Sequence, residues 1–101
     1  MREVVWTELA EADVHSILEY WTERNGSDTY SRKLARKFRM ALFMCAAYPK
    51  AAISVAGSTL QYTLVGAYAI YYTLNEQHLV VHHVWDQRRD PKDHPLAQPP
   101  D

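Results

Sequence analysis

Hydrophobic and polar positions change their period once along this chain, from a helical repeat in the first half to strand-like alternation in the last third. In the first half, apolar residues recur every three or four positions, which places them on one face of an amphipathic helix. Two such stripes occur: Ala10, Val14, Ile17, Leu18 and Trp21, then Leu34, Phe38, Ala41, Leu42 and Cys45. Because the link between them is short, we expect an antiparallel helical hairpin that buries both stripes against one partner.

Short polar signals mark the ends of these two helices. Thr7 supplies an N-cap hydroxyl for the first helix, and Gly26 suits the left-handed backbone that follows a helix end. Ser27 or Asp28 can cap the second helix almost immediately. Pro49 ends the second helix, because proline disfavours helical geometry in the residue before it.

The last third of the chain has the period of two that is typical of β-strands. Three runs rich in Leu, Val, Ile, Thr and Tyr lie between residues 58 and 91, and the connections contain Gly66 and Asn75, which tolerate positive φ. In the middle run, Tyr68, Ile70, Tyr72 and Leu74 alternate with Ala69, Tyr71 and Thr73. Residues 1–6 (MREVVW) form a further candidate strand. We therefore expect an α+β fold in the order β-α-α-β-β-β. A short N-terminal strand and the helical hairpin would pack on a mainly antiparallel sheet with a three-stranded C-terminal meander.

Length and composition indicate one folded domain outside the membrane. Of the 101 residues, 48% are hydrophobic, which is enough for one core but not two. We assign residues 1–91 to this domain and expect residues 92–101, which contain three prolines, to be disordered. No run is long enough to span a membrane and residues 1–10 lack the apolar centre of a signal peptide. A lone cysteine excludes an internal disulfide, so we expect a cytoplasmic protein.

The second helix has an unusual outer side. Its first half is basic, with Arg32, Lys33, Arg36, Lys37 and Arg39, which we interpret as a solvated surface. The net charge of the chain is −1, so a nucleic-acid role would need a local patch and not bulk charge. Further along the same side lie Met40, Phe43 and Met44. An apolar patch opposite the core stripe is either covered by the chain or exposed, and exposed patches of this kind usually mark a partner site.

Candidate chemistry gathers at the C-terminal end of the expected sheet. His82 and His83 are adjacent and should point to opposite faces of a strand, so we expect no metal site, and the isolated glycines form no phosphate loop or other cofactor motif. A wider set of side chains, which includes these two histidines, could converge near the end of the sheet: Tyr62, Tyr68, Tyr71, Tyr72, His82, His83, Trp85, Arg88 and Arg89. Aromatic rings with arginines can stack bases and hold phosphates, although rings in strands are more often core or cross-strand pairs.

The whole layout resembles the RelE/ParE superfamily of bacterial toxins. The resemblance rests on the opening Trp6-Thr7-Glu8 through Asp13 and Ile17, the Tyr48-Pro49 break, the run VGAYAIYY and the ending Arg88-Arg89-Asp90-Pro91. It implies the toxin half of a type II toxin–antitoxin pair, neutralised by a co-encoded antitoxin that forms a hetero-oligomer with it. Such antitoxins typically wrap the toxin with a helix or an extended segment, which would give Met40, Phe43 and Met44 a purpose as an antitoxin-binding or dimer-binding surface.

Two activities occur within this superfamily, and the resemblance implies different residues for each. RelE-like members cut mRNA on the ribosome with a cluster of Lys and Arg plus a Tyr or His, whereas ParE-like members poison DNA gyrase. Where family members often carry arginines on the first meander strand, this chain has Gln61 and Tyr62. A metal-free RNase needs several convergent cations and a proton carrier, so the missing arginines favour the ParE-like activity.

We therefore expect a ParE-like gyrase inhibitor that acts by binding, with Arg88, Arg89 and Trp85 as the target contacts. The alternative is a ribosome-dependent mRNA endonuclease in which His82, His83 and Tyr72 carry protons and the two arginines hold phosphate. A third interpretation is a member that has lost toxicity but still binds its antitoxin.

Overall fold

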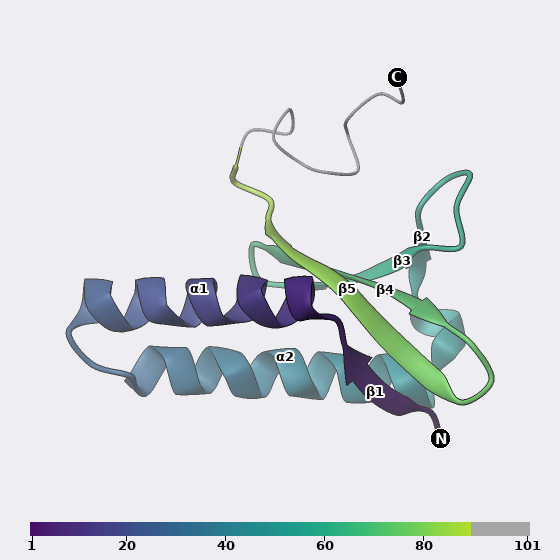
Figure 1. Ribbon diagram of the computed structural model, residues 1–101, viewed down its shortest axis with the longest axis horizontal. Coiled ribbons are helices and arrows are strands. Elements are labelled where there is room, and N and C mark those ends of the chain that lie inside the picture. The colour runs from purple at the N-terminus through teal and green to yellow at the C-terminus, as the bar shows by residue number, and fades with distance from the viewer. Residues whose placement is uncertain (90–101) are drawn as a thin grey trace.

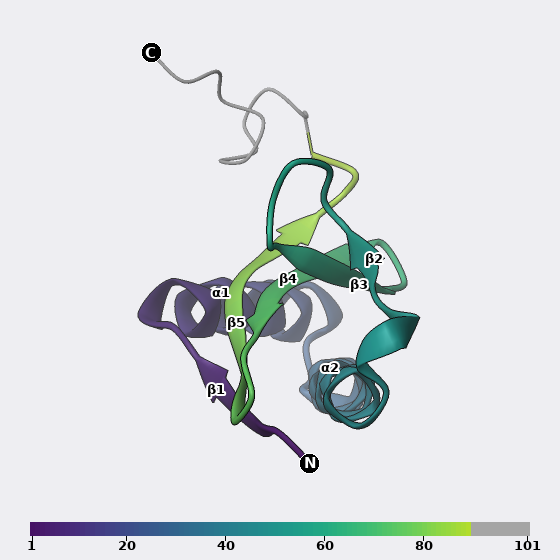
Figure 2. The ribbon, with the colours of Figure 1, turned by 90° about the vertical axis from the view of Figure 1, so that its right-hand side faces the viewer.

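Two helices cover one face of a five-stranded sheet in a computed structural model that describes residues 1–89 (Figures 1 and 2). In chain order the elements are β1 (Glu3–Trp6), α1 (Glu8–Asn25), α2 (Thr29–Ala47), a 3-10 turn (Pro49–Ala51), β2 (Ile53–Ser54), β3 (Gln61–Val65), β4 (Tyr68–Leu74) and β5 (His78–Asp86). The α+β class and the β-α-α-β-β-β order are confirmed, with the two-residue β2 as an additional strand. The Asp90-Pro91 ending and the tail 92–101 lie outside the described residues.

The helix ends follow the capping residues of the sequence. Thr7 Oγ1 accepts a hydrogen bond from the Ala10 amide at 3.1 Å, and Gly26 adopts φ 69° after α1. Asp28 occupies the N-cap position of α2 but forms no side-chain cap bond. Asn75 does not need positive φ. Its side chain instead accepts from the Gln77 and His78 amides and closes the β4–β5 connection as an Asx turn.

The first and the last strand of the sheet in chain order are neighbours. Its strand order is β1-β5-β4-β3-β2, and β1 pairs with β5 in parallel, while the other neighbours are antiparallel. Because β1 is short, it pairs only with the first half of β5, from His78 to Val81. Beyond that point the N-terminal end of α1 lies against β5, where the Thr7 amide donates to the Val81 carbonyl at 3.0 Å.

One irregularity in the sheet decides how the C-terminal residues are placed. Tyr71 pairs with His83 and Tyr72 pairs with Val81, so no residue of β4 lies in register with His82, which forms a β-bulge. As a result Val81 and Val84 both face the core, although they are three residues apart. The strand period of two therefore fails between these two valines.

The core lies between the helices and one face of the sheet, as the two apolar stripes predicted. Its fully buried side chains include Phe38 and Leu42 from α2 and Ile70, Tyr72 and Leu79 from the sheet. Ser31 is the one buried polar residue of the described chain, and its hydroxyl donates to the Leu18 carbonyl at 2.7 Å. Neither α1 nor α2 is both long and apolar enough for a membrane span.

Candidate functional site

The Arg88–Arg89 segment is a tight turn fixed by Asp86. The Asp86 carboxylate accepts from the Arg88 amide at 2.9 Å and from Arg88 Nε and Nη2 at 2.9 and 2.8 Å. The Arg89 amide donates to the Asp86 carbonyl at 3.0 Å. The Arg88 guanidinium lowers the pKa of Asp86, and the carboxylate raises that of Arg88 in turn. These hydrogen bonds therefore hold the Arg88 side chain in one orientation after β5.

The two guanidinium groups lie over different aromatic rings. Arg88 is 6.0 Å from the Trp21 ring centroid and 5.9 Å from that of Tyr68, whose hydroxyl accepts from Trp21 Nε1 at 2.8 Å. Burial raises the pKa of Tyr68. Arg89 instead lies 4.5 Å from the Trp85 centroid. The two arginines therefore do not form a single bidentate pair. Because Trp85 is only 6% exposed, its ring packs against Arg89 and presents little surface to a partner.

A cleft beside this turn separates α1 from the end of β5. Its volume is about 570 Å³, and both arginines line it together with Asp86 and Tyr68. The α1 wall consists of Asp13, Ser16, Ile17 and Tyr20. The cleft thus extends the Arg88–Arg89 turn into a continuous surface between a helix and a strand edge.

The two adjacent histidines both line a second cavity of about 330 Å³, on the sheet face that the helices leave open. The expectation that they point to opposite faces is wrong, because His82 is the bulged residue of β5. His82 Nε2 lies 2.8 Å from the Thr73 hydroxyl, and His83 Nδ1 lies 2.6 Å from Asp13 Oδ2. A carboxylate only accepts hydrogen bonds, so the Nδ1–H of His83 is the donor.

Asp13 counts toward the family resemblance, but no sequence pattern indicated its contacts at this site. Its Oδ2 accepts from the His83 ring and also from the Val84 amide at 3.0 Å, so one carboxylate joins α1 to the strand edge that β1 does not reach. In the sequence, Asp13 is one of several acids in the first half of a helix, where acids are common near the positive end. No local pattern distinguishes it from Glu11.

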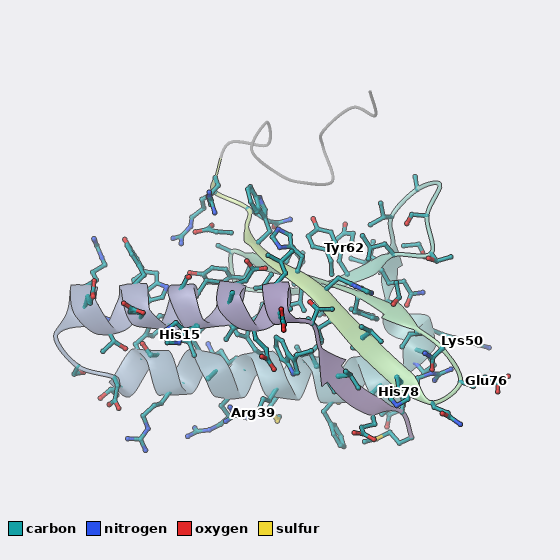
Figure 3. All side chains as sticks on the ribbon, in the orientation of Figure 1. His15, Arg39, Lys50, Tyr62, Glu76 and His78 are labelled. Atoms are coloured by element: carbon teal, nitrogen blue, oxygen red, sulfur yellow. The ribbon has the colours of Figure 1, made fainter. Side chains whose placement is uncertain are left out.

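Aromatic rings form a row across three strands on the open sheet face. The centroids of Tyr62 and Tyr71 lie 5.6 Å apart, those of Tyr71 and His83 6.3 Å apart, and those of His83 and Trp85 5.6 Å apart (Tyr62 is labelled in Figure 3). The predicted convergence of rings therefore occurs for these four, and Arg89 extends the row over Trp85.

Tyr72 does not belong to this face. It is fully buried against the helices and does not line the cavity that both histidines line. Burial and the neighbouring Cys45 thiol raise the pKa of Tyr72. Tyr71 lines the cavity in its place. The alternation along β4 already contained this information, since it places Tyr72 on the same face as Ile70.

Among the residues that the structure describes, no Lys or Arg side chain lines the histidine cavity. Besides both histidines, Tyr71 and Thr73, its lining consists of Leu9, Ser58, Thr59 and Leu60. Lys50, in the 3-10 turn before β2, is exposed and lies outside this lining. In the part of the chain that the structure describes, no group of three or more His, Cys, Asp and Glu side chains could hold a metal ion.

Met40, Phe43 and Met44 remain exposed on the outer side of α2. Their exposed fractions are 63%, 53% and 50%, so no part of residues 1–89 covers them. Of the two possibilities for this patch, the structure therefore shows the exposed one.

Comparison with known proteins places this architecture in a family. Residues 4–91 match the sequence profile described as the ParE toxin of the type II toxin–antitoxin system, parDE. A search of curated protein sequences found no match. Among solved structures, the chromosomal ParDE TA system from P. aeruginosa superposes with a TM-score of 0.69 at 10% identity, covering 83% of this chain and 94% of that chain. YafQ from E. coli superposes with a TM-score of 0.52 at 10% identity, covering 87% and 96%. At these identities the structural likeness shows the fold alone. The ParE sequence profile, in contrast, spans nearly the whole described chain. On the basis of this match, this protein belongs to the ParE family of type II toxins.

Proposed function

We propose that this toxin is ParE-like in its action: it inhibits growth in the cytoplasm by binding and poisoning DNA gyrase, and it performs no catalysis of its own. The observation that carries the proposal is the lining of the histidine cavity, which among residues 1–89 contains two imidazoles and several hydroxyls but neither Lys nor Arg. Cleaving RNA without a metal requires cations that stabilise the charge developing on the phosphate. A proton carrier without such cations is not sufficient for RNA cleavage.

The Arg88–Arg89 turn is the proposed gyrase contact. Two guanidinium groups at the end of β5 are held by a carboxylate and by aromatic rings, so less side-chain entropy is lost when a partner binds them. Arginines at such preorganised positions are frequent hot spots of protein interfaces.

The test replaces both arginines by Ala and measures growth inhibition, gyrase supercoiling and cleavage-complex formation. We expect all three effects to disappear while the circular dichroism spectrum stays unchanged, because both residues lie beyond the last strand. The matched control is Lys33→Ala, Lys37→Ala, which removes the same charge from the exposed face of α2 and should remain toxic. A double arginine variant that unfolds, or that is as toxic as the parent, contradicts the assignment.

The second candidate is a RelE-like mRNA endonuclease, and one observation favours it. The 2.6 Å pair of His83 and Asp13 borders a cavity on the open sheet face, as an orienting carboxylate and a general base would. Pulse labelling after induction separates the candidates. DNA synthesis that stops first, with double-strand breaks, supports gyrase poisoning, whereas translation that stops first, with mRNA cut at codons, supports the endonuclease. If neither stops, the chain has lost toxicity and only antitoxin binding remains to it.

The exposed patch Met40, Phe43 and Met44 is the proposed contact for the neutralising antitoxin, in a hetero-oligomer, or for a second copy of the chain. Burying three half-exposed apolar side chains would contribute favourably to such an interface. We expect Met40→Glu, Met44→Glu to weaken antitoxin binding or change the oligomeric state, measured by titration calorimetry and light scattering. Leu9→Glu, at a 55% exposed leucine outside the patch, is the control. Unchanged affinity together with an unchanged oligomeric state would rule the patch out.

A further inference from the structure

The cleft between α1 and the end of β5, here called the α1–β5 cleft, is lined by two carboxylates and two guanidinium groups. The carboxylate of Asp13 is held by two hydrogen bonds from β5, and its side chain is only 19% exposed. Asp86 and Arg88 share two side-chain hydrogen bonds of 2.9 and 2.8 Å. Arg89 is exposed, and within the described part of the chain no carboxylate forms an ion pair with it. The charge that the cleft presents to a partner is therefore that of Arg89.

The two arginines of the turn differ in how their guanidinium groups are engaged. The hydrogen bond from Arg88 is the largest cause that lowers the pKa of Asp86, and the charge of Arg89 is the smallest. Arg88 thus neutralises a carboxylate that would otherwise face the cleft. Arg89 lies 4.5 Å from the centroid of the Trp85 ring, which supports one face of its guanidinium group and leaves the hydrogen-bonding edge to a further partner.

The remaining lining of the α1–β5 cleft determines which kind of anion fits. Ile17, Tyr68 and Val84 contribute apolar surface beside the charged groups. A protein segment with a carboxylate for Arg89 and apolar side chains for this surface complements both features. A nucleic-acid backbone complements them less well, because its closely spaced phosphates would lie beside the two carboxylates of the cleft. The chemistry of the cleft therefore favours an acidic protein segment.

We propose that the α1–β5 cleft binds an acidic segment of a protein partner, in which one carboxylate pairs with Arg89, while Arg88 is a positioning residue that neutralises Asp86 and holds the turn. A guanidinium group suits this task because its planar fork can donate two parallel hydrogen bonds to one carboxylate. The inference rests on the proposed function in one respect: the partner is gyrase, so the acidic segment belongs to the enzyme and not to the DNA that it holds.

The test titrates the isotope-labelled full chain with three probes and follows the backbone amide signals by NMR. The first probe is a short peptide rich in Glu and Leu, the second has Gln in place of every Glu, and the third is a thymidine oligonucleotide with the same charge as the first. We expect the Glu peptide to bind about 3- to 5-fold more tightly than the Gln peptide, as one well-formed exposed ion pair allows. The signals that move should include Ser16 and Tyr20, which lie on the α1 wall of the cleft.

Removing Arg89 tests the ion pair itself. In Arg89→Ala the affinities for the Glu and Gln peptides should differ by less than about 2-fold, because no other accessible cation of the cleft replaces the guanidinium group. The matched control is Arg36→Ala, which removes the same charge from the exposed face of α2. This control should keep the full preference for the Glu peptide.

A rescue experiment tests the positioning role of Arg88. Arg88→Ala uncovers the carboxylate of Asp86, which then repels the Glu peptide, so the preference should fall. Adding Asp86→Asn removes that charge and keeps an oxygen that can accept from the backbone amide of residue 88. The double variant should therefore recover a preference of about 3-fold. If Arg88 paired with the carboxylate of the partner directly, the second substitution would restore nothing.

Three results would overturn the proposal: equal affinity for the Glu and Gln peptides, an oligonucleotide that binds the cleft more tightly than the Glu peptide, or no recovery in the double variant. These titrations contain no gyrase. A failed peptide preference therefore leaves gyrase poisoning untouched. If gyrase poisoning fails while the peptide preference holds, the cleft still binds an acidic segment, and that segment belongs to another protein.

Discussion

Replacing Asp13 by Ala tests whether one carboxylate holds α1 to the open edge of β5. The Asp13 side chain is 19% exposed and that of His83 is 12% exposed, so both hydrogen bonds of Asp13 Oδ2 are largely shielded from water. Removing the carboxylate takes the acceptor from the His83 ring and from the Val84 amide. This edge of β5 lies beyond the reach of β1, so no neighbouring strand replaces the lost acceptor.

The magnitude follows from two lost hydrogen-bond acceptors. Each buried donor that loses its partner costs about 1–3 kcal/mol, and the remaining exposure lets water recover part of that. We therefore expect Asp13→Ala to lower the free energy of unfolding by about 2–3 kcal/mol, which corresponds to a Tm lower by roughly 10–20 °C for a domain of this size. Asp13→Asn keeps the shape of the side chain and one hydrogen-bond acceptor, so we expect it to lower the free energy of unfolding by only about 1 kcal/mol.

The assay is equilibrium unfolding in urea followed by circular dichroism, with Glu23→Ala as the control. Glu23 is an exposed acid on the same helix, and its loss should change the free energy of unfolding by less than about 0.5 kcal/mol. A double-mutant cycle with His83→Ala should give a coupling energy of about 1 kcal/mol or more, because the two side chains are in contact. If Asp13→Ala is as stable as the Glu23 control, the carboxylate does not hold α1 to β5.

Three further predictions concern the core and the Arg88–Arg89 turn. Phe38→Ala empties the centre of the α2 stripe, where the ring is 1% exposed, and should cost about 3–5 kcal/mol in urea unfolding; a cost below about 1 kcal/mol would mean that the site collapses around the gap. Trp21→Phe removes the donor to the Tyr68 hydroxyl and should cost about 0.5–1.5 kcal/mol in urea unfolding; a free energy of unfolding equal to that of the parent would contradict that contact. Asp86→Asn removes a carboxylate whose pKa is lowered in the folded protein, so its stabilising effect is present above the unfolded pKa of about 3.9 and is lost as the pH falls through the lower folded value. The parent should therefore be more stable than Asp86→Asn at pH 7 and lose that advantage in acid, and a difference independent of pH would exclude the ion pair as its cause.

The candidate site was predictable as a set of residues but not as a geometry. Arg88 and Arg89 were expected to act together, yet their guanidinium groups lie over different rings because Trp21 and Tyr68 lie on one side of the turn and Trp85 on the other. These rings come from positions up to 67 residues away from the arginines, and no local rule relates them. The same holds for Asp13, which gains its role only where the chain brings β5 beside α1.

The local sequence is enough to predict the two helices, their ends and their buried faces, because periodicity, capping hydroxyls and proline geometry act over a few residues. It also determined the alternation that assigns Tyr72 to the core and Tyr71 to the opposite face. The parallel pairing of β1 with β5 and the bulge at His82 could not be predicted in this way. Both features depend on how strands far apart in the chain meet, and a single inserted residue in a strand moves every later side chain to the other face. The bulge therefore brings both histidines to one cavity that the local pattern had separated.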